Sequence, residues 1–165
     1  MITGNEMQAL DKAIMQQIMK EIKKSASDGG SVNKACKDAI TEKGVYKYVY
    51  EVYQGTRYIP RREHSGGLAD NDNLYTTTTG SGNTVIVDVE DRTPAGDAGM
   101  ANPPPDPVFY LSDVIEAGHE GRRWEDPDWP GPRPYMDKSL DDGCASGGEI
   151  TKALEALMRN IRINV

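Results

Sequence analysis

The residues that could support catalysis are few and scattered along the chain. His64 and His119 are the only histidines, and an acidic run, Glu125–Asp128, follows the second one. Together they would suit metal-assisted hydrolysis, which needs three or four ligands converging on one ion. Neither histidine stands at metal-ligand spacing from another ligand type, and the acidic run lacks the calcium-loop pattern. We expect solvated loop residues here, and a metal-dependent hydrolytic enzyme is only a remote alternative.

Motifs for covalent or phosphate chemistry are missing as well. The sequence contains no G-x-S-x-G elbow, no G-x-x-x-x-G-K-[ST] loop and no H-E-x-x-H pair. Cys36 and Cys144 stand far apart, which suggests neither a disulfide framework nor a metal cluster. We therefore predict no catalytic residue, no cofactor, no bound metal and no enzymatic activity.

Tyrosine and arginine form the one dense cluster of functional side chains. Tyrosine in excess of what a core can use is typical of protein–protein surfaces, although a half-buried helix with hydroxyls at the solvent would look the same. The arginines that follow could pair with carboxylates of a neighbouring subunit, approach DNA phosphates, or stay solvated. The tyrosines are Tyr46, Tyr48, Tyr50, Tyr53 and Tyr58, and the arginines are Arg57, Arg61 and Arg62.

Composition limits the kind of protein that carries these residues. The chain has 165 residues, a net charge of −7, 37% hydrophobic residues, 17 glycines and 10 prolines. This length predicts a single domain over residues 1–165, and the negative charge argues against a dedicated nucleic-acid binder. No apolar run is long enough for a membrane span, and the N-terminus lacks the pattern of a signal peptide. We expect a modest core with long loops, completed by neighbouring subunits.

The N-terminal third is expected to be helical. Apolar residues at helical spacing predict a first helix over Asn5–Lys24, and the Ser25–Ser31 stretch with its glycine pair ends it. This segment, residues 1–31, packs either on its own domain or on another copy. A second helix is expected over Val32–Lys43. The run Val45–Tyr53 has the composition of a strand but the spacing of a helix, and we predict a helix that continues past Gly44.

The middle of the chain favours a β-hairpin. Leu74–Thr79 and Asn83–Glu90 are rich in β-branched residues and are separated by Gly80-Ser81-Gly82. The following stretch, Asp91–Pro107, is rich in glycine and proline and is expected to be a loop. Val108–Ala117 is apolar and fits a strand, a short helix, or one followed by the other.

Two helices are expected near the C-terminus. Pro134–Asp142 predicts a short helix with proline in its first turn, and Glu149–Asn160 carries a clean apolar stripe. Ser146 and Glu149 have the spacing of a capping box. The tail, Ile161–Val165, could add a short strand. The predicted fold class is α+β, with a small antiparallel sheet formed by a long hairpin, packed against N-terminal and C-terminal helices and carrying long Gly/Pro-rich loops.

Two short blocks give the sequence a family resemblance. The first is Tyr58-Ile-Pro-Arg61-Arg62-Glu-His-Ser-Gly66-Gly67-Leu68-Ala-Asp70, which follows the tyrosine-rich segment. The second combines Val114-Ile-Glu116-Ala-Gly118 with Pro132-Arg133-Pro134-Tyr135-Met136. In this order, the blocks resemble the tail-completion (head–tail joining) proteins of tailed bacteriophages. The resemblance spans residues 45–159, and it departs from the family pattern at the long insertion Asp91–Pro107 and at His119 after Gly118.

The resemblance implies a non-catalytic virion protein. Its members are α+β subunits that form a ring, typically a hexamer, in the neck between capsid connector and tail tube. The implied partners are copies of the chain, the connector or adaptor, and tail-tube or tail-terminator proteins. DNA would pass through the ring without specific binding, and no membrane is involved. The implied location is the virion, with assembly in the host cytoplasm. A tail-terminator or minor capsid protein is the alternative.

The resemblance also marks the residues expected at subunit contacts. We expect Arg61 and Arg62 to pair with acidic residues such as Glu116 of a neighbour. The full set of expected interface residues is Tyr53, Tyr58, Arg61, Arg62, Gly66, Gly67, Leu68, Glu116, Arg133, Pro134 and Tyr135.

Overall fold

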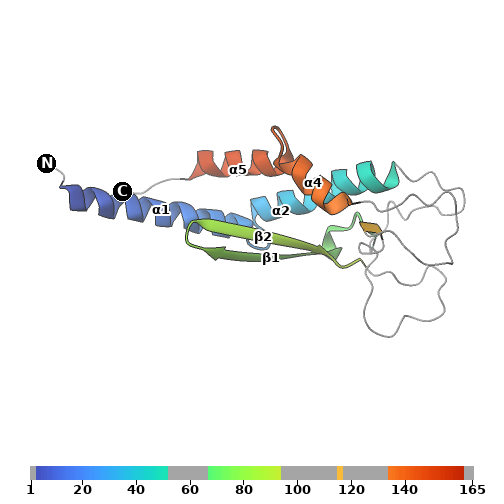
Figure 1. Ribbon diagram of the computed structural model, residues 1–165, viewed down its shortest axis with the longest axis horizontal. Helices are drawn as coiled ribbons and strands as arrows, with labels where there is room; N and C mark the ends of the chain where they lie inside the picture. The colour runs from blue at the N-terminus through green and yellow to red at the C-terminus, as the bar shows by residue number, and fades with distance from the viewer. Residues whose placement is uncertain (1–2, 52–66, 94–114, 117–133, 162–165) are drawn as a thin grey trace, which may run out of the picture.

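The computed structural model describes residues 3–51, 67–93, 115–116 and 134–161 of the chain. Its elements are α1 (Gly4–Ala26), α2 (Ser31–Asp38), η1 (Ala39–Tyr50), η2 (Asn71–Asn73), β1 (Leu74–Ser81), β2 (Thr84–Asp91), α4 (Tyr135–Cys144) and α5 (Glu149–Asn160). Helices precede and follow a two-stranded antiparallel sheet, which confirms the predicted α+β class. The described part is elongated: α1 forms one end, while η1 and the base of the hairpin lie toward the other (Figure 1).

The first helix carries an apolar stripe that its own chain only partly covers. The capping box that starts α1 is formed by Thr3 and Glu6, a signal that the sequence analysis missed. Leu10, Ile14, Ile18 and Ile22 are half-buried, but Met7 remains 55% exposed. Full burial begins only at Ser25 and Ala26, the last two residues of the helix. The predicted helix is confirmed, and it runs two residues past Lys24.

The second helix continues without a break into a π-helix. The backbone N–H of Glu51 donates to the carbonyl of Tyr46, five residues earlier, at 2.8 Å. Buried positions recur every four or five residues, at Ile40, Gly44–Val45 and Val49–Tyr50, as wider turns require. The helix predicted past Gly44 is therefore confirmed as far as Tyr50, although nothing in the sequence indicated the π form. Residues 52 and 53 lie outside the described part.

The predicted hairpin is confirmed, with β1 ending two residues later than predicted and β2 both starting and ending one residue later. Ser81 pairs with Thr84, so the turn consists of Gly82 and Asn83, with Gly82 at a φ of +58°. At the other end Leu74 pairs with Asp91, which makes Asp91 the last residue of β2. The prediction that placed Asp91 in a loop was wrong, because its side chain faces inward in the alternating pattern of β2 and is buried. The rest of the Asp91–Pro107 loop lies outside the description, except for Arg92 and Thr93.

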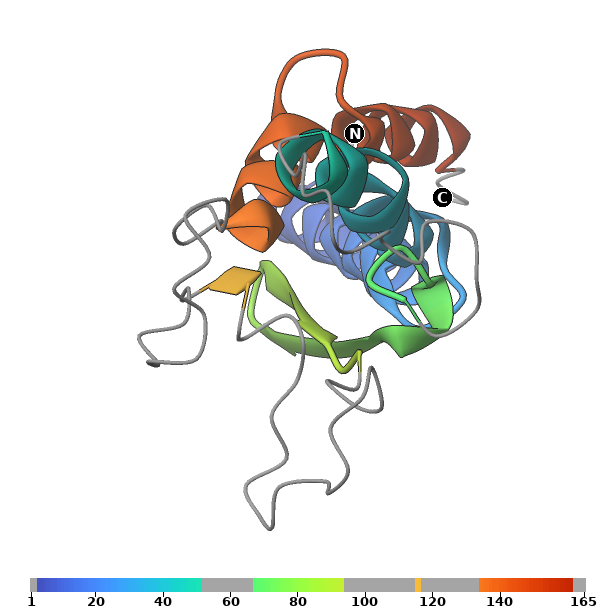
Figure 2. The same ribbon diagram turned by 90° about the vertical axis from the view of Figure 1, so that its right-hand side faces the viewer.

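One face of the hairpin packs against the helices (Figure 2). Val87 and Val89 contact a small cluster built from α2 and α5, centred on Cys36 and Ile150. A second cluster joins η1 to α4 and to the segments around Leu68 and Ile115. Burial raises the pKa of the Cys36 thiol to about 11, with a smaller contribution from Cys144. The outer face of the hairpin, by contrast, leaves Tyr75 and Ile86 each 51% exposed.

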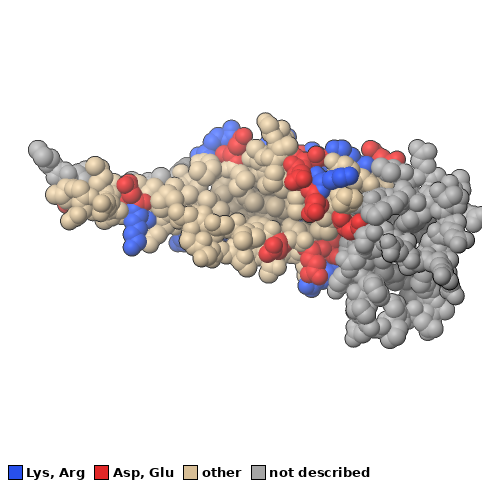
Figure 3. All heavy atoms as spheres, in the orientation of Figure 1, with Lys and Arg blue, Asp and Glu red and all other residues tan. Residues whose placement is uncertain are grey.

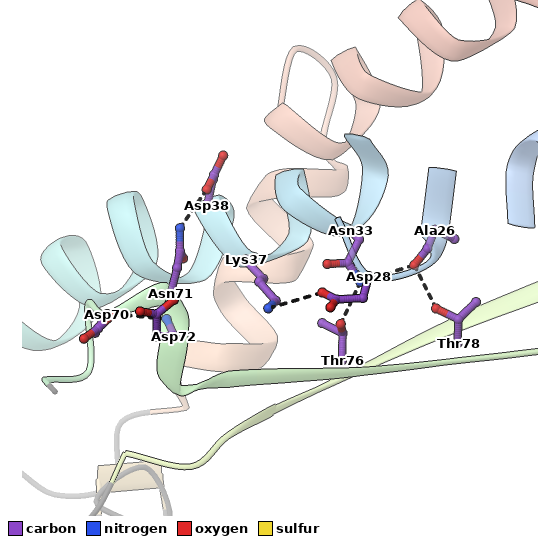
Figure 4. Close-up of polar contacts among 10 residues, drawn as sticks. All are labelled: Ala26, Asp28, Asn33, Lys37, Asp38, Asp70, Asn71, Asp72, Thr76 and Thr78. Atoms are coloured by element: carbon purple, nitrogen blue, oxygen red, sulfur yellow. Dashed lines mark hydrogen bonds and ion pairs between the residues drawn. The ribbon is translucent and has the colours of Figure 1, made fainter. Parts of the chain in front are cut away.

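Polar side chains fasten the hairpin to the corner between α1 and α2, and they fasten η2 to the far end of α2 through Asn71 and Asp38 (Figure 4). Asn33 Nδ2 donates to Thr76 Oγ1 at 2.7 Å and to the Ala26 carbonyl at 3.2 Å. Thr78 Oγ1 donates to the same carbonyl at 2.7 Å. Asn33 is 1% exposed, so these bonds satisfy an amide that burial would otherwise destabilise. They also explain why alternate threonines of β1 face the helices.

The two C-terminal helices are confirmed, but their predicted ends need correction. Pro134 precedes α4 as its N-cap rather than lying in the first turn. Gly148 is the N-cap of α5, and no side chain caps that helix. The expected capping box of Ser146 and Glu149 was therefore wrong, since the Glu149 carboxylate instead accepts a hydrogen bond from Lys43. Of the expected C-terminal strand, only Ile161 is described.

We predict that Gly44→Ala destabilises the protein. In a helix interior, alanine is normally more stabilising than glycine by roughly 0.5–1 kcal/mol. Here a Cβ at Gly44 would lie 1.6 Å from Ser139 Oγ and 2.4 Å from Ser139 Cβ, because η1 and α4 pack closely at this point. Overpacking of this kind costs about 1–3 kcal/mol, measurable as a lower free energy of unfolding in urea.

The clash can be separated from any backbone effect. Adding Ser139→Gly to Gly44→Ala removes both clashing atoms and should recover part of the lost stability. Gly4→Ala is the matched control, since a Cβ there meets nothing within 4 Å. Full stability of Gly44→Ala would show that α4 does not pack on η1 as described.

Candidate functional site

Three of the residues expected at subunit contacts, Gly67, Glu116 and Tyr135, lie in one polar cluster. We define this junction cluster as Gly67, Asp91, Thr93, Glu116 and Tyr135. Its members come from five places in the chain: a loop before η2, the end of β2, the residue pair after it, the segment at 115–116 and the start of α4. The sequence analysis missed Asp91 and Thr93, since an acid at the end of a strand usually indicates solvent.

A buried carboxylate lies at the centre of the junction cluster. The Tyr135 hydroxyl donates to Asp91 Oδ2 at 2.6 Å, and both side chains are buried. Asp91 Oδ1 accepts from the backbone N–H of Thr93 at 2.8 Å and from its hydroxyl at 2.6 Å. A buried carboxylate needs such donors, because an unpaired charge in the interior costs several kcal/mol. Burial, followed by the nearby Asp91 charge, raises the pKa of Tyr135 far above its usual range.

Glu116 performs a second structural task at the same place. Its Oε1 accepts from the backbone N–H of Met136 at 2.7 Å, within the first turn of α4. Pro134, the N-cap, provides no side-chain hydrogen bond, so Glu116 supplies a cap from a distant segment. Burial raises the pKa of Glu116, with a smaller contribution from Asp137, while the helix N–H groups oppose the shift.

Gly67 joins the cluster through its backbone. Its carbonyl accepts from Asn73 Nδ2 and from the Asp70 N–H, each at 3.0 Å, and lies 3.5 Å from Thr93 Oγ1. Leu68, next to it, is 3% exposed and belongs to the core around η1. The glycine–leucine block therefore fixes the start of the hairpin against η1 and α4.

The structure places the expected interface residues in three groups. Leu68 and Tyr135 are core residues, so in the folded chain neither side chain is available to a partner. Gly67, Glu116 and Pro134 are partly exposed, and their part in a subunit contact stays a prediction. Six others lie outside the described residues: Tyr53, Tyr58, Arg61, Arg62, Gly66 and Arg133.

The tyrosines of η1 are largely used by the fold itself. Tyr50 is 6% exposed and lies in the core, with its ring edge-on to Tyr46 at 5.3 Å between centroids. The Tyr48 hydroxyl donates to Asp142 Oδ2 at 2.7 Å, beside the ion pair of that carboxylate with Lys47 at 2.6 Å. Tyr46, 39% exposed, is the described tyrosine of this helix that offers the largest surface to a partner.

The described residues show no candidate metal centre. In residues 3–51, 67–93, 115–116 and 134–161, no three His, Cys, Asp or Glu side chains converge to hold an ion. His64, His119 and Glu125–Asp128 lie outside these ranges, so the metal hypothesis stays untested. Among the same residues, no helix has the length and apolar character that crossing a bilayer requires.

Taken together, these features define a small α+β protein in which a helix-covered hairpin is closed by a buried polar cluster. The family model named YomN matches residues 6–160, almost the whole chain. The chain belongs to the YomN family. YomN is a phage-derived, prophage-type protein name, and the match indicates a phage-associated protein. No curated protein and no solved structure matches the chain.

We predict that Tyr135→Phe destabilises the protein without changing its shape. The variant keeps the ring in the core but removes the hydroxyl that donates to Asp91 Oδ2. Leaving a buried acceptor without its donor costs about 1–3 kcal/mol. Chemical denaturation monitored by circular dichroism measures this loss. Tyr75→Phe, at an exposed position, is the control. Equal stability of both variants would contradict a buried Tyr135–Asp91 bond.

Glu116 should also leave a signature in the pH dependence of stability. Because its pKa is raised in the folded state, the folded protein holds this proton more tightly than the unfolded chain does. This contribution is complete below the usual glutamate pKa and is lost as pH rises through the raised folded value. Glu116→Gln should therefore gain stability relative to the parent protein across that rise.

Urea denaturation at several pH values measures the difference between the two proteins. Glu155→Gln, on the exposed face of α5, serves as the control for a lost surface charge. A relative loss of stability by Glu116→Gln with rising pH would reverse the sign and refute the argument.

Proposed function

We propose that the protein is a virion structural protein of a tailed phage, a ring-forming tail-completion subunit at the head–tail junction. Membership of a phage-associated family supports the general setting. The tail-completion role rests on the ordered resemblance of residues 45–159. Its expected partners are copies of itself, the connector or adaptor, and the tail-tube or tail-terminator proteins, and we propose the virion as its location. A tail-terminator or minor capsid role is the alternative.

The structural observation that carries this proposal is the exposed apolar surface of the first and last helices. On α1, Met7 and Met15 are 55% and 42% exposed, and on α5, Leu154 and Met158 are 40% and 55% exposed. Fully burying an exposed side chain of this kind is worth about 1.5–3 kcal/mol, and the part of these side chains that is still exposed would gain roughly half of that. Large apolar side chains gathered on two helices of a small protein are typical of subunit interfaces. A ring built from one repeated contact would cover both faces of every subunit.

The proposal is consistent with a non-enzymatic role. The polar side chains of the junction cluster hold the hairpin and α4 together. Asp91 and Tyr135 are too deeply buried to meet a substrate. The net charge of −7 suits a subunit that lines a DNA path without binding the duplex, since acidic surface repels phosphate.

The mass of the purified full-length protein in solution tests the proposal. We expect light scattering across a concentration series to show a closed oligomer near six subunits, or a monomer that assembles when tail components are added. Leu154→Glu with Met158→Glu should weaken assembly while leaving the helical circular dichroism unchanged. Thr77→Glu with Thr79→Glu, on the exposed face of the hairpin, is the matched control.

One combination of results would contradict the proposed ring. A strict monomer that ignores tail components and carries stoichiometric zinc or manganese by elemental analysis would favour the hydrolytic enzyme instead. The proposed ring would then be abandoned.

A further inference from the structure

One side of α1 combines lysines and methionines at helical spacing. The spacing of these residues along α1, in steps of three, four, one and three, places them in one stripe on one side of the helix. They are Lys12, Met15, Met19, Lys20 and Lys23. Together with the hairpin turn at residues 82–83, this stripe lines an open groove of about 520 Å³. We call it the lysine–methionine groove.

The groove has an apolar floor and a basic rim. Met15 is 42% exposed, and Met19 is half-buried. Lys23 lies along the hairpin, with its Cε 3.2 Å from where a Cβ on Gly80 would stand. Within the described residues, the ammonium groups of Lys12, Lys20 and Lys23 make no ion pair. The flexible, polarisable methionines can adapt to a packed surface, and the lysines select an acidic one.

An acidic surface of the same protein carries the complementary charge. Asp137 and Asp141 lie one turn apart on α4, both exposed, and their carboxylates make no ion pair within the described part. We call this pair the α4 ridge. The charge of Asp137 contributes to the raised pKa of Glu116 nearby, after the larger effect of burial. Acidic side chains are also visible over the α4 part of the surface in Figure 3.

The two surfaces cannot meet within one molecule. Lys12–Lys23 lies on the half of the elongated chain that ends at the N-terminus, whereas α4 lies toward the opposite end (Figure 1). Lys20 and Lys23, like Asp137 and Asp141, are one helical turn apart, about 5–6 Å between Cβ atoms. Two ammonium groups can therefore face two carboxylates at once when helices from different copies pack together.

We propose that the lysine–methionine groove of one copy binds the α4 ridge of a second copy, head to tail. The inference rests on the proposed function only in assuming that the chain assembles with its own copies. Because the groove and the ridge are different surfaces, each subunit keeps one of each free. Such a heterologous contact repeats until it closes into a ring or grows as a filament.

The choice of a second copy over other acidic partners follows from charge. Four lysines and three acids make α1 weakly basic in a chain of net charge −7. Duplex DNA and anionic membranes are uniformly negative and would meet repulsion from the acidic remainder of the chain, whereas a second copy can bring one acidic ridge to the groove and turn its basic α1 elsewhere. Every copy of the chain carries both surfaces, so the ridge is always present at the same concentration as the groove.

A charge exchange tests the inference. Lys20→Glu/Lys23→Glu makes the groove acidic, and Asp137→Lys/Asp141→Lys makes the ridge basic. Each variant alone should associate about tenfold more weakly or worse, since like charges then face each other. An equimolar mixture should recover assembly, because both possible contacts between unlike variants are complementary. The quadruple variant should assemble by itself. Sedimentation velocity over a concentration series measures association, and circular dichroism confirms folding.

The matched control is Lys34→Glu/Lys152→Glu, which changes the net charge equally on other helices and should assemble normally. If the parent protein assembles and neither double variant differs from it, the proposed surfaces are wrong while the proposed function stands. If the parent protein stays monomeric at every concentration, with and without tail components, both fail. Binding of the parent protein to duplex DNA or phosphatidylserine vesicles, lost in Lys20→Glu/Lys23→Glu, in place of self-association would assign the groove to that partner instead.

Discussion

The hydrogen bond between Tyr135 and Asp91 is the contact on which the arrangement of this protein depends. It joins the first residue of α4 to the last residue of β2, which are 44 positions apart in the chain. The carboxylate is buried, and moving α4 along the hairpin would take away the Tyr135 donor while the two donors from Thr93 stay in place. The loss of a hydrogen bond to a buried charge is costly. That penalty fixes α4, and α4 in turn determines where α5 starts. A polar group thus specifies the fold where a modest apolar core would allow several packings.

The second constraint is the close approach of η1 and α4. Gly44 faces Ser139 with no room for a Cβ, and the Ser139 hydroxyl donates to the Tyr135 carbonyl. The π form of η1 presents Ile40, Val45 and Val49 to the same core. The junction cluster and this helix pair therefore support each other, since both hold the start of α4. Disturbing either one should loosen the other, as expected for groups in a shared network.

Much of the fold was predictable because it depends on local patterns. Apolar stripes indicated the helices, and β-branched residues around a glycine turn indicated the hairpin. The errors arose where tertiary contacts decide. Glu149 had the spacing of a capping residue, but Lys43 from a distant helix takes its carboxylate. Asp91, which local patterns place in a loop, ends β2 and accepts a hydrogen bond from Tyr135 in the core. The sequence alone did not predict that Asp91 and Thr93 join the junction cluster, because its members come from distant parts of the chain and follow no regular spacing.

The division between inner and outer surfaces links the fold to assembly. The inner faces of the hairpin and of α2 are satisfied within the chain, by Asn33, Thr76 and Thr78 as well as by apolar contacts. The long α1, in contrast, is fully buried only at its last two residues, so most of its stripe gains little from its own chain. Helices in proteins owe most of their stability to the packing of their apolar face against the rest of the protein. Covering this stripe with a neighbouring subunit would therefore stabilise α1 and join the copies in one step, which is the physical reason to expect that folding of the first helix and assembly are coupled.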